Sequence, residues 1–413
     1  MNDLDATHDD LVRELAEGKR RFHALPDSLN ATERAAVRRA ALAQRFGADL
    51  TKTGEYTLDA EAAADRHCEN MIGATQIPVG VVGPLSVRGD YADGDFYVPL
   101  ATTEGALVAS INRGANAITA AGGASVHVED VGMTRAPVFK TSGLAETREF
   151  LAWVVANEDA MREVAEATSR YLRLLDVKTY AIGTTVFVRF RFSSGDAMGM
   201  NMATIACDRV VHELVEVQTG VQCIALSGNY CVDKKPAAVN FQHGRGKRVQ
   251  AEVVLDASVL RKLKTNAADL VEVQYRKNLL GSIAAGATGY NAHFANVLAA
   301  FFLATGQDPA HVAEASMGVT TIEAHGDDGV IVSVFLPDTP IAAVGGGTTL
   351  DTQREALAIL GVKADPERPG VAALRLAEIL GATVLAGELS LMAAFTSKDL
   401  AGAHERLGRS AQS

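Results

Sequence analysis

The sequence lacks the features of disulfide-bonded, zinc-binding, membrane-spanning and secreted proteins. None of its four cysteines forms a C-x-x-C pair, so we expect reduced thiols, a cytosolic protein and no metal site. No uncharged apolar run approaches the ~20 residues of a membrane helix; the longest lies near 297–304. The acidic first residues also lack the basic and apolar regions of a signal peptide. We therefore expect a soluble protein that binds no membrane.

Basic charge is scarce as well. The chain has 39 Lys and Arg against 50 Asp and Glu, with a formal net charge of −11. An acidic surface does not favour nucleic-acid binding, and a phosphorylated ligand would need a local basic pocket. No G-x-G-x-x-G stands between a predicted strand and helix. The sequence therefore gives no indication of a Rossmann domain.

The length and patterning of the chain predict more than one domain. The 413 residues exceed what a single hydrophobic core usually serves, so we expect two or three domains. Residues 1–66 are charged and predict short helices over 10–25 and 31–46, a packing or oligomer-contact segment. Helical and strand-like patterns follow one another within 137–225 and predict a compact α/β unit.

Local patterns predict several elements within these regions. A strand should lead into Thr102 and Thr103, with a helix beginning near Glu104 and ending at the glycines 122–123. Residues 145–178 are helical in pattern and 268–305 predict a buried helix. Residues 179–192 alternate as a strand, with one apolar face made by Val186, Val188, Phe190 and Phe192. We expect Ser194 and Asp196 to cap the helix that follows.

Six segments carry a family resemblance. They are ENMIGATQIPVGVVGPL, ATTEGALVASINRG, GDAMGMNM, SGNYCVDKKPAA, GYNAHFANVLAAFFLATGQD and GELSLMAA. Together they resemble hydroxymethylglutaryl-CoA (HMG-CoA) reductase over roughly residues 67–413, in its class I form but without a membrane anchor. The resemblance implies NADPH-dependent, four-electron reduction of HMG-CoA to mevalonate and CoA by a cytoplasmic enzyme.

The resemblance also implies an α+β architecture and an assembly. A large substrate domain, 67–136 and 226–413, would be built around a long central helix. A small ferredoxin-like NADPH-binding domain, 137–225, would be inserted into it, after the helical segment 1–66. Active sites would form between the subunits of a homodimer or homotetramer, with the DKK loop of one subunit facing the cofactor domain of the other.

Four residues match the family's catalytic positions. Lys234 would stabilise the oxyanion that forms from the thioester carbonyl, and Asp233 would orient its loop. Glu104 would donate a proton at the aldehyde stage, which requires its pKa to be raised by burial or by a neighbouring carboxylate. Asp308 would be that neighbour and would contact both Lys234 and Glu104. His404 would protonate the departing CoA thiolate.

The binding residues come from the same matches. Those expected to hold the substrate are Arg135, Ser227, Asn229, Lys235, His293 and Asn296. Those expected to receive the nicotinamide cofactor are Asp196, Met198, Gly199, Met200, Asn201, Gly345, Gly346 and Gly347. Ser169 and Arg170 match a site for the adenosine 2′-phosphate, so NADPH is expected over NADH. Ser410 follows Arg409 at the position of a regulatory phosphoserine in animal relatives, and we infer no such regulation.

Two other functions compete with this one. One is a different enzyme on the same fold, such as a CoA lyase or acyltransferase that needs no nicotinamide. The other is a catalytically inactive relative that serves as a binding or scaffold protein. GDAMGMNM and Ser169–Arg170 argue against the first. Expected residue types at all four catalytic positions argue against the second.

Overall fold

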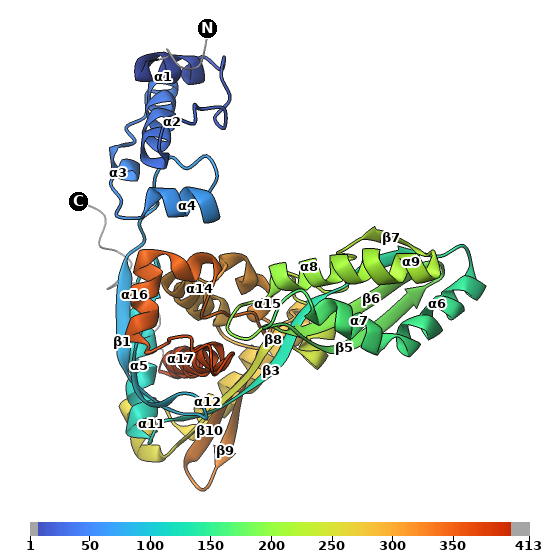
Figure 1. Cartoon of the computed structure of the whole chain (residues 1–413). Coiled ribbons are helices and arrows are strands. Elements are labelled where there is room, and N and C mark those ends of the chain that lie inside the picture. The colour runs from blue at the N-terminus through green and yellow to red at the C-terminus, as the bar shows by residue number, and fades with distance from the viewer. Residues whose placement is uncertain (1–6, 398–413) are drawn as a thin grey trace.

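The structure, a computed structural model, describes residues 7–397. Buried apolar side chains form three separate clusters, one in an N-terminal helical segment, one in a large body and one in a smaller unit. In Figure 1 the N-terminal helices project from the large body, and the smaller unit extends from its side. This is a mixed helix-and-sheet fold, in agreement with the α+β prediction.

The N-terminal segment consists of four helices. They are α1 (His8–Ala16), α2 (Ala31–Phe46), α3 (Thr51–Gly54) and α4 (Ala60–Arg66). Both α1 and α2 begin with a capping box, in which Thr7 and Asn30 accept backbone N–H groups three residues on. The predicted range of α2 is confirmed, whereas the prediction for the first helix ran too far. The chain leaves α1 after Ala16, and Gly18 turns with φ 75°.

One ten-stranded sheet runs through the large body and the smaller unit. Its main path has the order β7-β4-β6-β3-β8-β10-β9. In the large body the strands are β1 (Val79–Arg88), β2 (Asp93–Ala101), β3 (Ala124–Arg135), β8 (Arg245–Leu255), β9 (Val319–His325) and β10 (Gly329–Thr339). Strand β3 joins the two parts, because residues 125–132 pair with β8 and residues 133–135 pair with β6. Within residues 7–397, the strands of this sheet pair antiparallel except for the short parallel pairing between β1 and β3.

Helices pack against this sheet around α17 (Val371–Thr396), which lies in the middle of the large body (Figure 1). Within the large body, the longest others are α5 (Leu107–Ala120), α14 (Phe294–Thr305) and α16 (Asp351–Ile359). The shorter ones are α10 (Ala238–His243), α11 (Ala257–Lys262), α12 (Ala267–Val273), η2 (Gln274–Gly281), α13 (Ser282–Ala285), η3 (Pro309–His311), α15 (Val312–Ala315) and η4 (Gly346–Thr349). Helices α5 and α17 cross closely at Gly114, where an added Cβ would stand 1.9 Å from the carbonyl oxygen of Ala386.

Helix α17 is long and apolar enough to cross a membrane by length and composition alone, although charged residues interrupt its apolar sequence. Its apolar window is 83% buried inside the protein. Its two carboxylates, Glu378 and Glu388, are fully buried and accept backbone N–H groups from the loops at 90–92 and 292–293. These features are those of the core helix of a folded domain.

The prediction of one buried helix over 268–305 was wrong. The segment is divided into α12, the π-helix η2, α13 and α14. Gly286 ends α13 in the left-handed conformation, with φ 67°, and α14 begins only after His293. The periodicity of small residues continues across the break, so it does not reveal the interruption.

The smaller unit has the order strand, helix, strand, strand, helix, strand. Its elements are β4 (Val138–Lys140), α6 (Leu144–Ala156), α7 (Glu158–Glu166), β5 (Arg173–Ile182), β6 (Thr185–Ser193), α8 (Met200–Val210), η1 (Val211–Val215), α9 (Glu216–Thr219) and β7 (Gln222–Ala225). The predicted strand 179–192 is a hairpin that turns at Gly183, φ 61°. The predicted apolar face on β6 is confirmed, since Val186, Val188, Phe190 and Phe192 are all buried.

Candidate active site

The loop between β7 and α10 carries the DKK residues in an unusual backbone conformation. Three of its non-glycine residues have positive φ: Asn229 at 63°, Val232 at 52° and Lys234 at 59°. Each such residue costs of order 1–3 kcal/mol and persists only where its surroundings hold it. The loop is therefore a strained segment, and its contacts explain what maintains it.

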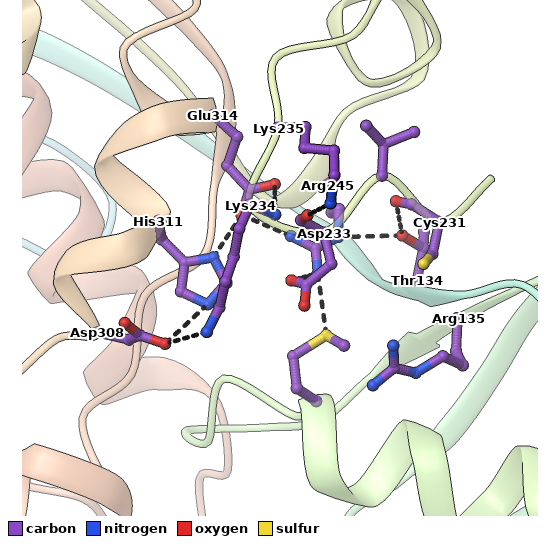
Figure 2. A network of polar contacts seen from close by, with 12 residues as sticks. Thr134, Arg135, Cys231, Asp233, Lys234, Lys235, Arg245, Asp308, His311 and Glu314 are labelled. Atoms are coloured by element: carbon purple, nitrogen blue, oxygen red, sulfur yellow. Dashed lines mark hydrogen bonds and ion pairs between the residues drawn. The ribbon is translucent and has the colours of Figure 1, made fainter. Parts of the chain in front are cut away.

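Lys234 and Asp308 form an ion pair across this loop, with Nζ 2.7 Å from Oδ2. Asp308 lies in the turn between α14 and η3, and Figure 2 shows the Lys234 side chain running down to it. The hydrogen bond to Asp308 raises the pKa of Lys234. Partial burial is the largest single influence on the Asp308 pKa and raises it, but the hydrogen bonds from Lys234 and the Ala310 N–H, together with the nearby positive charge, outweigh it and lower the pKa. Both groups are therefore charged near neutral pH.

The buried side chain of Arg245 also anchors the DKK loop. Arg245, fully buried at the start of β8, has Nη2 2.7 Å from Asp233 Oδ1 and Nη1 2.7 Å from Glu314 Oε1. The backbone N–H of Lys234 donates to Glu314 Oε2 at 3.0 Å. His311 also donates through Nδ1 to Glu314. The prediction that Asp233 orients the loop agrees with its contact to Arg245, which Figure 2 displays.

Asp233, His311 and Glu314 are close enough together to be considered as metal ligands, and no other such group was found in residues 7–397. The guanidinium of Arg245 already contacts the two carboxylates of this group. A divalent ion there would meet this fixed positive charge at short range. We therefore describe the group as a buried ion network rather than a metal centre.

Glu104 belongs to a second group of predicted residues. It lies in the turn between β2 and α5, where its Oε1 accepts from Asn296 Nδ2 at 3.2 Å. His293, at the start of α14, has a buried Nε2 with no hydrogen-bond partner in the described part of the chain. Its backbone N–H donates to Glu388 at 2.7 Å.

The expected contact of Asp308 with Lys234 is present, and its expected contact with Glu104 stays a prediction. Asp308 pairs with Lys234, but no hydrogen bond or ion pair within residues 7–397 joins it to Glu104. The chain thus presents its catalytic candidates in two groups, one on the DKK loop and one at the starts of α5 and α14. Sequence spacing contains no information about this separation.

The predicted substrate residues divide between the same two groups. Arg135, at the end of β3, donates to Thr204 Oγ1 at 2.6 and 3.0 Å. Ser227 contacts the Cys231 sulfur at 3.4 Å, and the exposed Lys235 donates to the Asp233 carbonyl at 3.0 Å. These three and Asn229 lie on or beside the DKK loop, whereas His293 and Asn296 lie with Glu104.

A cavity of about 570 Å³ brings together two glycine-containing segments that are far apart in the sequence. One wall is residues 198–201, where α8 begins, and the other is residues 345–347. Asp308 also lines this cavity, so the Lys234–Asp308 pair lies at its edge. Gly347 packs on Gly306 so closely that an added Cβ would stand 2.6 Å from the Gly306 carbonyl oxygen. The size is typical of a small-ligand site.

The predicted roles of Ser194 and Asp196 as helix caps were wrong. Helix α8 begins at Met200 after Gly199, which has φ 97°, and has no side-chain cap. The Ser194 hydroxyl donates instead to the carbonyl oxygens of Ala197 and Met198. Asp196 is buried and accepts the backbone N–H of Ala373 at 3.0 Å. Its carboxylate therefore fastens the segment to the start of α17 and does not line the cavity.

Ser169 and Arg170 lie in the turn between α7 and β5, outside the cavity lining. The Arg170 guanidinium lies 4.6 Å from the ring centre of Tyr171, and the Ser169 hydroxyl accepts the backbone N–H of Tyr171 at 3.3 Å. This exposed cation and hydroxyl are available to an anionic group.

Some lining residues were missed by the sequence analysis. Arg66 and His67 reach the main cavity from the end of α4, although residues 1–66 were expected to form a packing or oligomer-contact segment. A second cavity of about 290 Å³ lies beside α5 and is lined by Asn112, Arg113, Asn116 and Lys262. Arg113 and Lys262 make this cavity basic, as a phosphorylated ligand of an acidic protein would need.

Lys277 was also missed, because the segment was interpreted only as a buried helix. It lies on the π-helix η2, with its ammonium 4.9 Å from the Phe395 ring centre. Burial lowers its pKa, while Glu388 opposes that shift. Perturbed lysines and π-helical turns are both frequent at functional sites. His404 and Ser410 lie outside the described residues.

Comparisons with known proteins show which family this chain resembles. The family model described as hydroxymethylglutaryl-coenzyme A reductase matches residues 34–409. A 3-hydroxy-3-methylglutaryl-coenzyme A reductase from Aeropyrum pernix is 51% identical over 97% of this chain and 96% of its own length. The protein of that name from Pyrococcus abyssi is 47% identical over 97% of this chain and 99% of its own length.

A solved structure has a similar fold at low sequence identity. It is the class II 3-hydroxy-3-methylglutaryl-CoA reductase from Streptococcus pneumoniae, bound to NADPH in open conformations. The TM-score is 0.66 at 18% identity, with 96% of this chain and 99% of that chain covered. The structural likeness supports the fold, and the sequence matches extend over nearly the whole chain. The chain therefore belongs to the hydroxymethylglutaryl-coenzyme A reductase family.

Proposed function

We propose that the protein reduces HMG-CoA to mevalonate and CoA with two molecules of NADPH. The observation that carries this proposal is the Lys234–Asp308 ion pair, 2.7 Å long, at the edge of the cavity formed by residues 198–201 and 345–347. A fixed ammonium beside a cavity of cofactor size is the arrangement that carbonyl reduction needs.

Lys234 is the proposed oxyanion donor. When the thioester carbonyl is reduced, negative charge develops on its oxygen, and a positioned ammonium stabilises that charge. The raised pKa of Lys234 keeps this ammonium protonated at neutral pH. A donor of this kind typically accounts for a factor of about 10²–10³ in kcat.

NADPH would supply the hydride when bound in the main cavity. The glycines 345–347 let the backbone approach a ligand closely, and Met198 to Asn201 form the opposite wall. Ser169 and Arg170 support NADPH over NADH, because guanidinium and hydroxyl groups suit a 2′-phosphate. The strand order β7-β4-β6, with β5 beside β6, supports a ferredoxin-like cofactor domain over residues 137–225.

The second group of residues supports a site shared between two copies of the chain. Within residues 7–397, no hydrogen bond or ion pair joins Glu104, Asn296 or His293 to the DKK loop. We propose that a partner subunit brings its own DKK loop to Glu104 in a homodimer or homotetramer. The basic cavity beside α5 would then bind the CoA phosphates, and His404 would protonate the CoA thiolate.

We further propose the class I form, in a cytoplasmic enzyme. The archaeal relatives are 47% and 51% identical to this chain, whereas the class II chain is 18% identical. The structural likeness to the class II chain supports the fold and carries no argument about the class.

The proposal is tested by mixing the purified protein with NADPH and HMG-CoA and following NADPH absorbance. We expect oxidation that depends on HMG-CoA and is faster with NADPH than with NADH. Folded protein that oxidises no NADPH on addition of HMG-CoA would rule out the proposed reaction.

A further inference from the structure

His311 and Glu314 lie beside the Lys234–Asp308 pair, on the turn η3 and helix α15 (Figure 2). Both side chains are fully buried, and buried ionisable groups are costly unless they are paired. Structural pairing explains part of this arrangement, because Arg245 neutralises Glu314 at 2.7 Å. Pairing with Arg245 does not explain why Glu314 also accepts the backbone N–H of Lys234, or why His311 faces the carboxylate of Asp308.

Glu314 acts on the backbone of the loop. Its Oε2 accepts the N–H of Lys234 at 3.0 Å, and that residue is left-handed with φ 59°. Its Oε1 accepts from Arg245 and from His311 Nδ1. The Glu314 carboxylate therefore bonds at one oxygen to the strained Lys234 backbone and at the other to the buried side chains of Arg245 and His311. A fixed acceptor at this point stabilises a backbone conformation that lysine otherwise avoids.

His311 acts on the other member of the pair. Its Nδ1 donates to Glu314, while its Nε2 is buried, has no hydrogen-bond partner in the described part of the chain, and lies 3.8 Å from Asp308 Oδ2. The same Oδ2 atom accepts the Lys234 ammonium at 2.7 Å. Figure 2 shows the imidazole beside the Lys234 stem, with its free edge toward Asp308. An unpaired buried ring nitrogen so close to a carboxylate calls for an explanation.

The proposed reaction supplies one. When the Lys234 ammonium turns toward the substrate oxygen, its hydrogen bond to Asp308 weakens, and the carboxylate needs another donor. We propose that His311 is a positioning residue that carries a proton on each ring nitrogen, so that Nε2 donates to Asp308 at that moment while Nδ1 donates to Glu314. Glu314 meanwhile holds the Lys234 backbone in place. The proposal rests on the proposed function, and it concerns residues that act only through Lys234 and Asp308.

Two conservative substitutions separate the two ring nitrogens. Glutamine at 311 places its amide near the former Nε2, so His311→Gln keeps a donor for Asp308. Asparagine places its amide near the former Nδ1, so His311→Asn keeps the contact with Glu314 and loses the one with Asp308. We expect His311→Gln to keep kcat within about threefold and His311→Asn to lower it by roughly tenfold to a hundredfold. KM for HMG-CoA and the NADPH dissociation constant should change by less than about twofold in both.

Two further measurements keep the test independent of folding. Glu378→Gln is the matched control for Glu314→Gln, since Glu378 is equally buried but accepts the N–H groups of residues 90–92. We expect Glu314→Gln to lower kcat and Glu378→Gln to lower only the melting temperature. In an Asp308→Asn background, His311→Asn should cause no additional loss of kcat, because its target is already altered.

The outcomes separate this proposal from the proposed function. Wild-type protein without HMG-CoA-dependent NADPH oxidation would refute the function itself. An active wild type in which His311→Gln and His311→Asn have equal kcat would overturn only the role of His311. Losses that multiply in the Asp308→Asn background would overturn it as well.

Discussion

Replacing Lys234 with methionine should separate catalysis from stability. Methionine keeps most of the apolar stem and removes the ammonium that lies 2.7 Å from Asp308 Oδ2. The Lys234 and Asp308 side chains are 42% and 36% exposed, so the pair is screened by solvent. Pairs of this kind contribute about 0–1 kcal/mol to folding. We therefore expect the free energy of unfolding to change by less than about 1 kcal/mol.

The effect on the rate should be much larger. Loss of one oxyanion donor typically costs about 2.7–4 kcal/mol of transition-state stabilisation, or a factor of 10²–10³ in kcat. The assay compares kcat from NADPH oxidation with the NADPH dissociation constant and the denaturation midpoint. Lys363→Met, at an exposed lysine between α16 and α17, is the matched control and should leave all three unchanged. If Lys234→Met keeps kcat within tenfold of the wild type, Lys234 is not the oxyanion donor.

Three further predictions concern the cofactor, the assembly and pH. Arg170→Glu should raise KM for NADPH far more than KM for NADH, because like charges repel at the 2′-phosphate; equal effects would remove the reason to prefer NADPH. Mixing unfolded Lys234→Met and Glu104→Gln chains and refolding them together should restore part of the activity if the site is shared between copies, and no recovery would place the whole site in one chain. The pKa of Lys234 is raised and that of Asp308 is lowered. The stability that the Lys234 ammonium contributes is therefore complete below the ordinary lysine pKa and is lost as pH rises through the raised pKa of the folded state. The stability that the Asp308 carboxylate contributes is complete above the ordinary aspartate pKa and is lost as pH falls through the lowered pKa of the folded state. The difference in unfolding free energy between the wild type and Asp308→Asn should thus be constant from about pH 5 to pH 9; a steady change across that range would contradict these directions.

Much of the fold was predictable where a local pattern controls the structure. Helix α2 has its predicted bounds, and the apolar face of β6 is buried as its alternation indicates. The failures occur where one backbone position interrupts a continuing pattern. Gly183 turns the predicted strand into a hairpin, and Gly286 divides the predicted helix. Side-chain periodicity does not record whether a glycine adopts positive φ.

The candidate site was predictable from motifs, but its geometry was not. The sequence identified Lys234, Asp308, Met198–Asn201 and Gly345–Gly347, and the structure gathers these around one cavity. It did not indicate Arg245 or Glu314, because their contacts join positions 69 residues apart for Arg245–Glu314 and 80 residues apart for Lys234–Glu314. It did not indicate His311 either, because its local spacing to Asp308 and Glu314 does not reveal that its ring is buried between them. Nor did it show that Asp196 would bond to α17 instead of lining the cavity.

The ratio of NADPH oxidised to CoA released tests the central claim most directly. Purified protein with limiting HMG-CoA would be followed by NADPH absorbance and by a thiol reagent that detects free CoA. A four-electron reduction to mevalonate predicts two NADPH consumed for each CoA. A ratio of one with accumulated aldehyde, or release of CoA without NADPH oxidation, would contradict the account.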